Sequence, residues 1–82
     1  MCLYVRSLKL KEGRKIQAIL RRGKNRTAIR RAQVILMSAQ EMRVRDIALQ
    51  TLLHPEYVRR LIRRFDIEGL RLFEERPGRG RP

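Results

Sequence analysis

The sequence is poor in the residues that build metal sites and disulfides. It contains one cysteine, Cys2, and one histidine, His54. A single cysteine cannot form an internal disulfide, and the two residues together fall short of the four ligands of a structural zinc site. We therefore expect neither a metal nor a cofactor, and we interpret Cys2 as an incidental thiol in a reducing environment.

Long apolar runs are missing as well. No segment approaches the roughly 18–20 apolar residues that cross a bilayer. The opening letters MCLYV are fewer than the apolar centre of a signal peptide requires. These absences predict a soluble, intracellular protein without a membrane partner.

Acidic residues are scarce relative to basic ones. Eight Asp and Glu stand against 21 Lys and Arg in 82 residues, which gives a net charge of +13. Such an excess repels itself in a folded chain and favours a polyanionic partner. Nucleic acid is the first candidate, and an anionic membrane surface is the competitor. Several segments share apolar stripes, which favours a globule over one helix lying on a membrane.

Apolar periodicity predicts an all-α fold in one small domain. Residues 1–10 form an extended basic arm, which we expect to pack loosely, with a DNA-tracking arm as the alternative. A first helix is expected from residue 11 or 12 to residue 22, ended by Gly23 with a positive φ. A second helix, capped by Thr27, runs to about residue 41 and forms the centre of the core. The helical domain spans residues 11–73, and residues 74–82 form an extended tail.

Residues 44–68 predict a helix-turn-helix. A short helix over residues 44–53 is followed by a recognition helix over about residues 55–68, which begins at a proline and ends at Gly69. In the recognition helix apolar residues recur at i, i+3, i+4 and i+7, and four arginines occupy the remaining faces. The expected architecture is a homeodomain-like three-helix core with an extra N-terminal helix. The apolar positions are Val58, Leu61, Ile62 and Phe65.

Candidate DNA contacts follow from this arrangement. The N-terminal half of a recognition helix enters the major groove, so Glu56, Tyr57 and Arg60 are the base-reading candidates. Arg60 suits guanine O6 and N7, Glu56 suits cytosine N4, and Tyr57 suits a phosphate or a thymine methyl, with packing on the core as its alternative. Six residues are phosphate candidates: His54, Arg59, Arg63, Arg64, Arg30 and Arg31.

Alternatives stay open for several of these residues. His54 is also placed to cap the recognition helix, and Asp66 and Glu68 are expected partners of Arg63 and Arg64. For Arg30 and Arg31 a solvated face is an equal alternative. The tail residues Arg79, Gly80, Arg81 and Pro82 match the core of an AT-hook, which fits an A·T minor groove. A linker is the equal alternative for this tail.

Several motifs resemble the N-terminal DNA-binding region of IS630-type transposases in the IS630/Tc1/mariner superfamily. An alanine-rich helix precedes the helix-turn-helix, and an EGL segment and a GRP segment follow it. The matching residues are Arg31-Ala32, Ile47-Ala48, Val58-Arg59-Arg60, Phe65, Glu68-Gly69-Leu70, Arg76-Pro77 and Gly80-Arg81-Pro82. The family usually has an apolar residue at the position of Thr51, glycine at Leu52 and serine at His54. Leucine in place of glycine predicts a different turn or an extra core contact.

The resemblance implies recognition of transposon terminal inverted repeats. In that family catalysis belongs to a downstream part whose three carboxylates hold two Mg²⁺ ions, so we expect no catalytic residue here. The expected protein is a transposase-derived DNA-binding module in the prokaryotic cytoplasm, associated with the nucleoid. A stand-alone repressor of transcription or transposition is the alternative. We expect this protein to bind double-stranded DNA and to pair with either a second copy of itself or a separately encoded catalytic subunit. No small-molecule substrate is expected.

Overall fold

The computed structural model describes residues 3–74, and the regular secondary structure of this part is all helical. The helices are α1 (Leu10–Arg22), α2 (Arg26–Ala39), α3 (Val44–Thr51) and α4 (Pro55–Glu68), followed by the 3₁₀ helix η1 (Gly69–Phe73). No strand occurs between residues 3 and 74, which confirms the all-α fold. None of these helices combines the length and the apolar character needed to cross a membrane.

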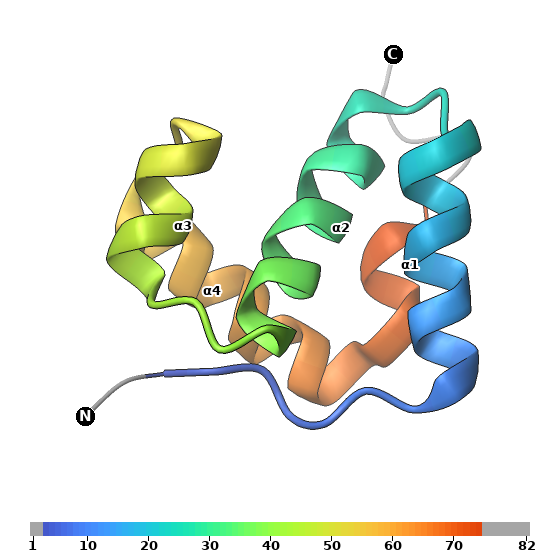
Figure 1. Cartoon of the computed structure of the whole chain (residues 1–82), viewed down its shortest axis with the longest axis horizontal. Coiled ribbons are helices and arrows are strands. Elements are labelled where there is room, and N and C mark those ends of the chain that lie inside the picture. Colours follow the sequence, from blue (N-terminus) through green and yellow to red (C-terminus); the bar gives the residue numbers. More distant parts are fainter. Residues whose placement is uncertain (1–2, 75–82) are drawn as a thin grey trace, which may run out of the picture.

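Helix α2 lies at the centre of the arrangement (Figure 1). It packs against α1, α3, α4 and η1, and in Figure 1 α1 and α3 lie on opposite sides of it, with η1 on the side of α1. Within residues 3–74, α1 contacts only α2 and η1 among the helices. The small side chains of Ala28, Ala32 and Ser38 are buried, which lets neighbouring helices approach α2 closely. The expected central position of this helix is confirmed.

Helix α4 buries the four apolar residues expected from their spacing. Val58, Leu61, Ile62 and Phe65 are all fully covered. Each such side chain contributes roughly 1.5–3 kcal/mol relative to an exposed one. The ring of Phe65 lies against Phe73 of η1, with 5.9 Å between ring centroids. This contact brings the end of the described chain back onto the core.

The connection between α1 and α2 differs from the expectation in two details. Asn25, and not Thr27, caps α2, because its side-chain oxygen accepts hydrogen bonds from the backbone N–H groups of Thr27 and Ala28 at 2.8 and 3.3 Å. Gly23 has φ −63°, so the expected positive φ is wrong. A Cβ at Gly23 would collide with the carbonyl oxygen of Ile19. Glycine is required there because the carbonyl oxygen of Ile19 comes too close for a Cβ, and not because the backbone is left-handed.

Leu52 forms the left-handed corner between α3 and α4. Its backbone has φ 60° and ψ 34°, a conformation that strongly favours glycine. Its side chain is 89% exposed. The expectation of an extra core contact is therefore wrong, and the leucine holds the turn that glycine usually makes in the resembling family.

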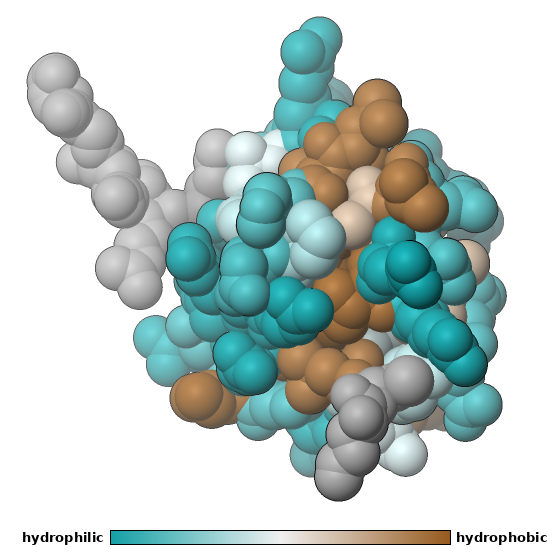
Figure 2. All heavy atoms as spheres, turned by 90° about the vertical axis from the view of Figure 1, so that its left-hand side faces the viewer, coloured by the Kyte–Doolittle hydropathy of each residue, from teal (hydrophilic) through white to brown (hydrophobic). Residues whose placement is uncertain are grey.

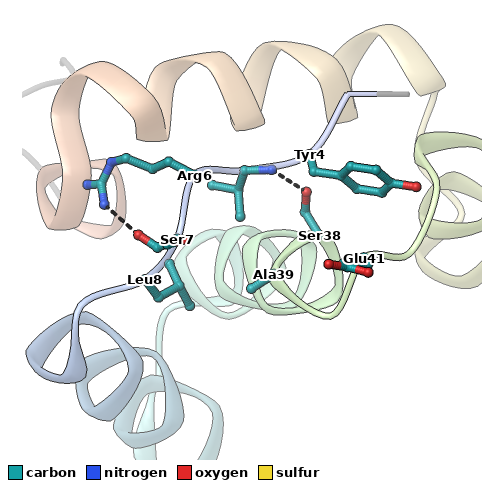
Figure 3. A pocket seen from close by; sticks show the side chains of 8 residues that line it. Tyr4, Arg6, Ser7, Leu8, Ser38, Ala39 and Glu41 are labelled. Carbon is teal, nitrogen blue, oxygen red and sulfur yellow. Dashed lines mark hydrogen bonds between the residues drawn. The ribbon is translucent and has the colours of Figure 1, made fainter. Parts of the chain in front are cut away.

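Residues 3–9 run in irregular conformation between α2 and α4 and lead into α1, and hydrogen bonds attach them to both α2 and α4 (Figure 3). The backbone N–H of Val5 donates to Ser38 Oγ at 2.8 Å, and that of Arg6 donates to Asp66 Oδ1 at 3.2 Å. The guanidinium of Arg6 lies 4.8 Å from the centre of the Phe65 ring. Loose packing was the wrong expectation for this segment. A pocket of about 310 Å³ lies between it and the end of α2.

Glu12 joins this segment to α1. Its carboxylate accepts hydrogen bonds from Arg6 Nη1 and Nη2 at 2.9 and 2.7 Å, and from the backbone N–H of Lys9 at 2.9 Å. The hydrogen bonds from Arg6 lower the pKa of Glu12 to about 2, against the opposing effect of burial. The ion pair therefore holds the N-terminal segment against α1 over a wide pH range.

Candidate nucleic-acid interface

Helices α3 and α4 form the helix-turn-helix pair. Three residues separate Thr51 from Pro55, which is the usual length of such a turn. The hydroxyl of Thr51 donates to the carbonyl oxygen of Ile47 at 2.7 Å inside α3. This bond satisfies a buried hydroxyl at the helix end, so Thr51 fits a position where the resembling family has an apolar residue.

The N-terminus of α4 is capped by the side chain of His54. Its Nδ1 accepts a hydrogen bond from the backbone N–H of Glu56 at 3.0 Å, so the expected capping role is confirmed. Accepting through Nδ1 requires that the neutral ring carries its proton on Nε2. His54 is exposed, so this Nε2–H remains a donor for a phosphate oxygen at the end of the helix.

The outer face of α4 carries four exposed residues that lie opposite its buried face. Their positions recur at i, i+4, i+7 and i+11, which places them on one line along the helix. These residues, which we call the α4 outer face, are Glu56, Arg60, Arg63 and Ile67. Arg60 and Arg63 have no ion-pair partner among residues 3–74. Two unpaired cations on one exposed line match the requirement for a DNA-facing helix.

The other two arginines of α4 are paired with acids of the same helix. Arg59 Nη1 lies 2.9 Å from Glu56 Oε2, and Arg64 Nη2 lies 3.2 Å from Glu68 Oε1. Exposed pairs of this kind contribute about 0–1 kcal/mol, so exchanging the acid for a phosphate costs little. Asp66, an expected partner of the arginines, instead accepts the bond from the Arg6 backbone.

Two further candidates take part in packing. Tyr57 is half-buried and lies against the hydrophobic core, on the flank of α4. Arg31 Nη1 donates to the carbonyl oxygen of Leu72 at 2.8 Å, which ties α2 to η1. Its Nε is buried without a hydrogen-bond partner. Arg30 is exposed in the first half of α2.

The structure also exposes three large apolar side chains of the helix-turn-helix that were not among the candidate DNA contacts. Ile67 is 85% exposed on the α4 outer face, and its place off the buried stripe was the available signal. Leu49 and Leu52 are 71% and 89% exposed at the end of α3. Figure 2 looks onto this end of the molecule and shows hydrophobic spheres among hydrophilic ones. Arg79, Gly80, Arg81 and Pro82 lie outside the described residues.

Comparison with known proteins adds one match. The sequence profile of the winged helix-turn-helix family matches residues 31–82, a region that begins in α2 and contains α3, α4 and η1. No curated protein and no solved structure matches the chain. The part of the matched region that the structure describes, residues 31–74, consists of helices and the turns between them and contains no strand that could form a wing.

Proposed function

The chain belongs to the winged helix-turn-helix family, and from this membership we propose that it binds one specific double-stranded DNA sequence through α4. The α4 outer face is the observation that carries the proposal. It presents the exposed, unpaired guanidinium groups of Arg60 and Arg63 on a helix whose start is fixed by the His54 cap. A rigid helix with free donors on one line suits base reading in a major groove.

The residues divide into base readers and backbone contacts by their place on α4. Arg60 lies in the second turn of the helix, within the half that enters the groove, and forks onto guanine O6 and N7. Glu56 leaves its exposed pair with Arg59 and accepts from cytosine N4. Arg63 lies one turn further from the N-terminus and binds a phosphate, as does the Nε2–H of His54.

The proposed target is a terminal inverted repeat of a transposon. The resemblance of the EGL segment, residues 68–70, and of the GRP segment, residues 80–82, to IS630-type transposases supports this target. The proposed module binds the DNA ends without cutting them, and four of its eight acids are held in hydrogen bonds. The acids engaged in this way are Glu12, Glu56, Asp66 and Glu68.

Selection of bound duplexes from a random pool gives the site, and Arg60→Ala then tests how the site is read. We expect the variant to lose its preference at one base pair, at a cost of about 1–3 kcal/mol, and to keep its preferences elsewhere. The measurement is the affinity for a set of duplexes that each carry one base-pair change. An equal loss on every duplex would show that Arg60 holds a phosphate and does not read a base.

Arg64→Ala is the matched control for Arg60→Ala. Arg64 lies on the same helix, off the α4 outer face, and is already paired with Glu68. We expect its replacement to leave the pattern of base preferences unchanged. If selection from the pool recovers no common sequence, specific recognition through α4 is refuted.

A further inference from the structure

Most of the positive charge lies outside the helix-turn-helix. Residues 43–68 contain six Lys and Arg and four acids, a net charge of +2. Residues 10–30, which form α1, the loop after it and the start of α2, contain eight Lys and Arg and one acid, a net charge of +7. The excess charge therefore gathers on the part of the chain that precedes the helix-turn-helix.

The eight cations of residues 10–30 are all exposed, and none has a salt-bridge or side-chain hydrogen-bond partner within residues 3–74. The single acid of the segment, Glu12, is covered and bound by Arg6. Unpaired like charges at helical neighbours repel one another and destabilise the free protein. We call these cations the α1 basic surface: Lys11, Arg14, Lys15, Arg21, Arg22, Lys24, Arg26 and Arg30.

The geometry of α1 directs this surface outward. Its buried side holds Ile16 and Glu12, which face α2 and the N-terminal segment. The cations of α1 occupy the remaining sides along about 16 Å of helix, from Lys11 to Arg22. Lys24 and Arg26 continue the row beyond the helix end. An extended row of free cations matches the closely spaced phosphates of a duplex.

Helix α2 separates the α1 basic surface from the α4 outer face. Within residues 3–74, α1 makes no contact with α3 or α4, and Figure 1 shows α1 and α3 at opposite ends of the long axis. The molecule measures 40 Å along this axis. Because α1 contacts neither helix of the helix-turn-helix, its cations are free to bind a duplex other than the one that α4 holds.

We propose that the α1 basic surface binds the phosphate backbone of a second DNA duplex, without regard to sequence, so that one molecule bridges two duplexes. The bridging rests on the proposed function, since α4 holds the first duplex. An anionic membrane is the less suitable partner, because a helix on a membrane inserts a wide apolar side and α1 buries its apolar side in the core.

A capture assay with the full chain tests the proposal. One duplex carrying the selected site is fixed to beads, and a second, fluorescent duplex of unrelated sequence is added with the protein. The test variant combines Arg14→Gln, Lys15→Gln, Arg21→Gln and Arg22→Gln, all at exposed positions. We expect capture of the second duplex to fall at least about tenfold, since four phosphate contacts are lost. Binding of the bead-bound duplex changes far less.

If these four residues instead stabilised the fold, the variant would lose thermal stability. The free variant should melt at the same temperature as the unaltered protein or above it, because repulsion is removed, and a lower melting temperature would contradict our reading of this surface. Undiminished capture by the variant would refute the proposal, as would the absence of capture with the unaltered protein. An equally large loss on the single duplex would show that α1 contacts the same duplex as α4, which also refutes bridging.

The two proposals fail in distinguishable ways. If α4 does not read sequence, selection recovers no site, while capture between two duplexes of arbitrary sequence still depends on the α1 basic surface. If the α1 basic surface binds no second duplex, selection succeeds, and the Arg14, Lys15, Arg21 and Arg22 replacements leave capture unchanged. The pair Arg60→Ala and Arg63→Ala is the reciprocal variant: it removes cations from α4 and leaves α1 intact, so it should weaken binding of the selected duplex and leave the α1-dependent binding of the unrelated duplex in place.

Discussion

Replacing Leu52 by glycine should stabilise the protein. Leu52 lies at the corner between α3 and α4 with φ 60° and ψ 34°. In this left-handed conformation the Cβ of an L-residue crowds the following carbonyl oxygen, whereas glycine has no Cβ. The leucine side chain is 89% exposed, so its removal sacrifices almost no packing. The substitution thus relieves the backbone without opening a cavity.

The magnitude follows from two opposing effects. Left-handed backbone costs a non-glycine residue about 1–2 kcal/mol. Glycine lowers the free energy of unfolding by about 0.5–1 kcal/mol, because a glycine in the unfolded chain has more conformational freedom to lose. The expected net gain in the free energy of unfolding for Leu52→Gly is about 0.5–1 kcal/mol. For a domain of this size that gain raises the melting temperature by about 2–8 °C.

Urea unfolding followed by circular dichroism measures this change in stability. Leu52→Ala is the matched control, since it removes the exposed side chain and keeps the left-handed conformation. We expect the alanine variant to stay within about 0.5 kcal/mol of the unaltered protein. Loss of stability in Leu52→Gly, or an equal gain in Leu52→Ala, would refute the assignment of strain to the backbone of residue 52.

Two further predictions concern the contact between Glu12, Arg6 and Gly69. Glu12 has its pKa lowered to about 2 from an ordinary 4.5, so its pairing stabilises the fold above about pH 4.5 and is lost as the pH falls towards 2. Because the Arg6 side chain is 35% exposed, we expect the free energy of unfolding to fall by about 1–2 kcal/mol over this pH range. Urea unfolding at a series of pH values measures this fall. In Glu12→Gln the free energy of unfolding should depend less on pH over the same range. Gly69→Ala should cost about 1–3 kcal/mol, because φ 61° with ψ −134° is nearly restricted to glycine. The nearest side-chain atoms to an added Cβ lie 3.5 and 3.6 Å away, so a clash is not the reason, and retained stability would contradict the assignment of strain.

Sequence reasoning works for this fold where local signals agree. Helix α4 spans Pro55–Glu68 as expected, because a proline in its first turn, a buried stripe and Gly69 at its end all mark the same bounds. It fails where the position of a segment depends on a partner that is far away in the sequence. The attachment of the N-terminal segment depends on Ser38 and Asp66, which are 33 and 60 residues away in sequence from their partners.

The candidate interface shows the same division. The spacing of the arginines on α4 placed Arg60 and Arg63 away from the apolar stripe, and the structure leaves both exposed. Periodicity alone does not tell which acid pairs with which arginine, so Asp66 was expected beside α4 arginines and instead binds Arg6. The engagement of Arg31 by a carbonyl oxygen 41 residues away is also invisible in the sequence.

The central place of α2 also has a consequence for the order of folding. Helices α1 and α3 are neighbours of α2 in sequence as well as in space, so they can dock early, when short loops cost little entropy to close. The N-terminal segment must instead find Ser38 and Asp66 across much longer loops. We expect it to dock last and to detach first, so that the first opening of this protein exposes Phe65 while the helices remain assembled.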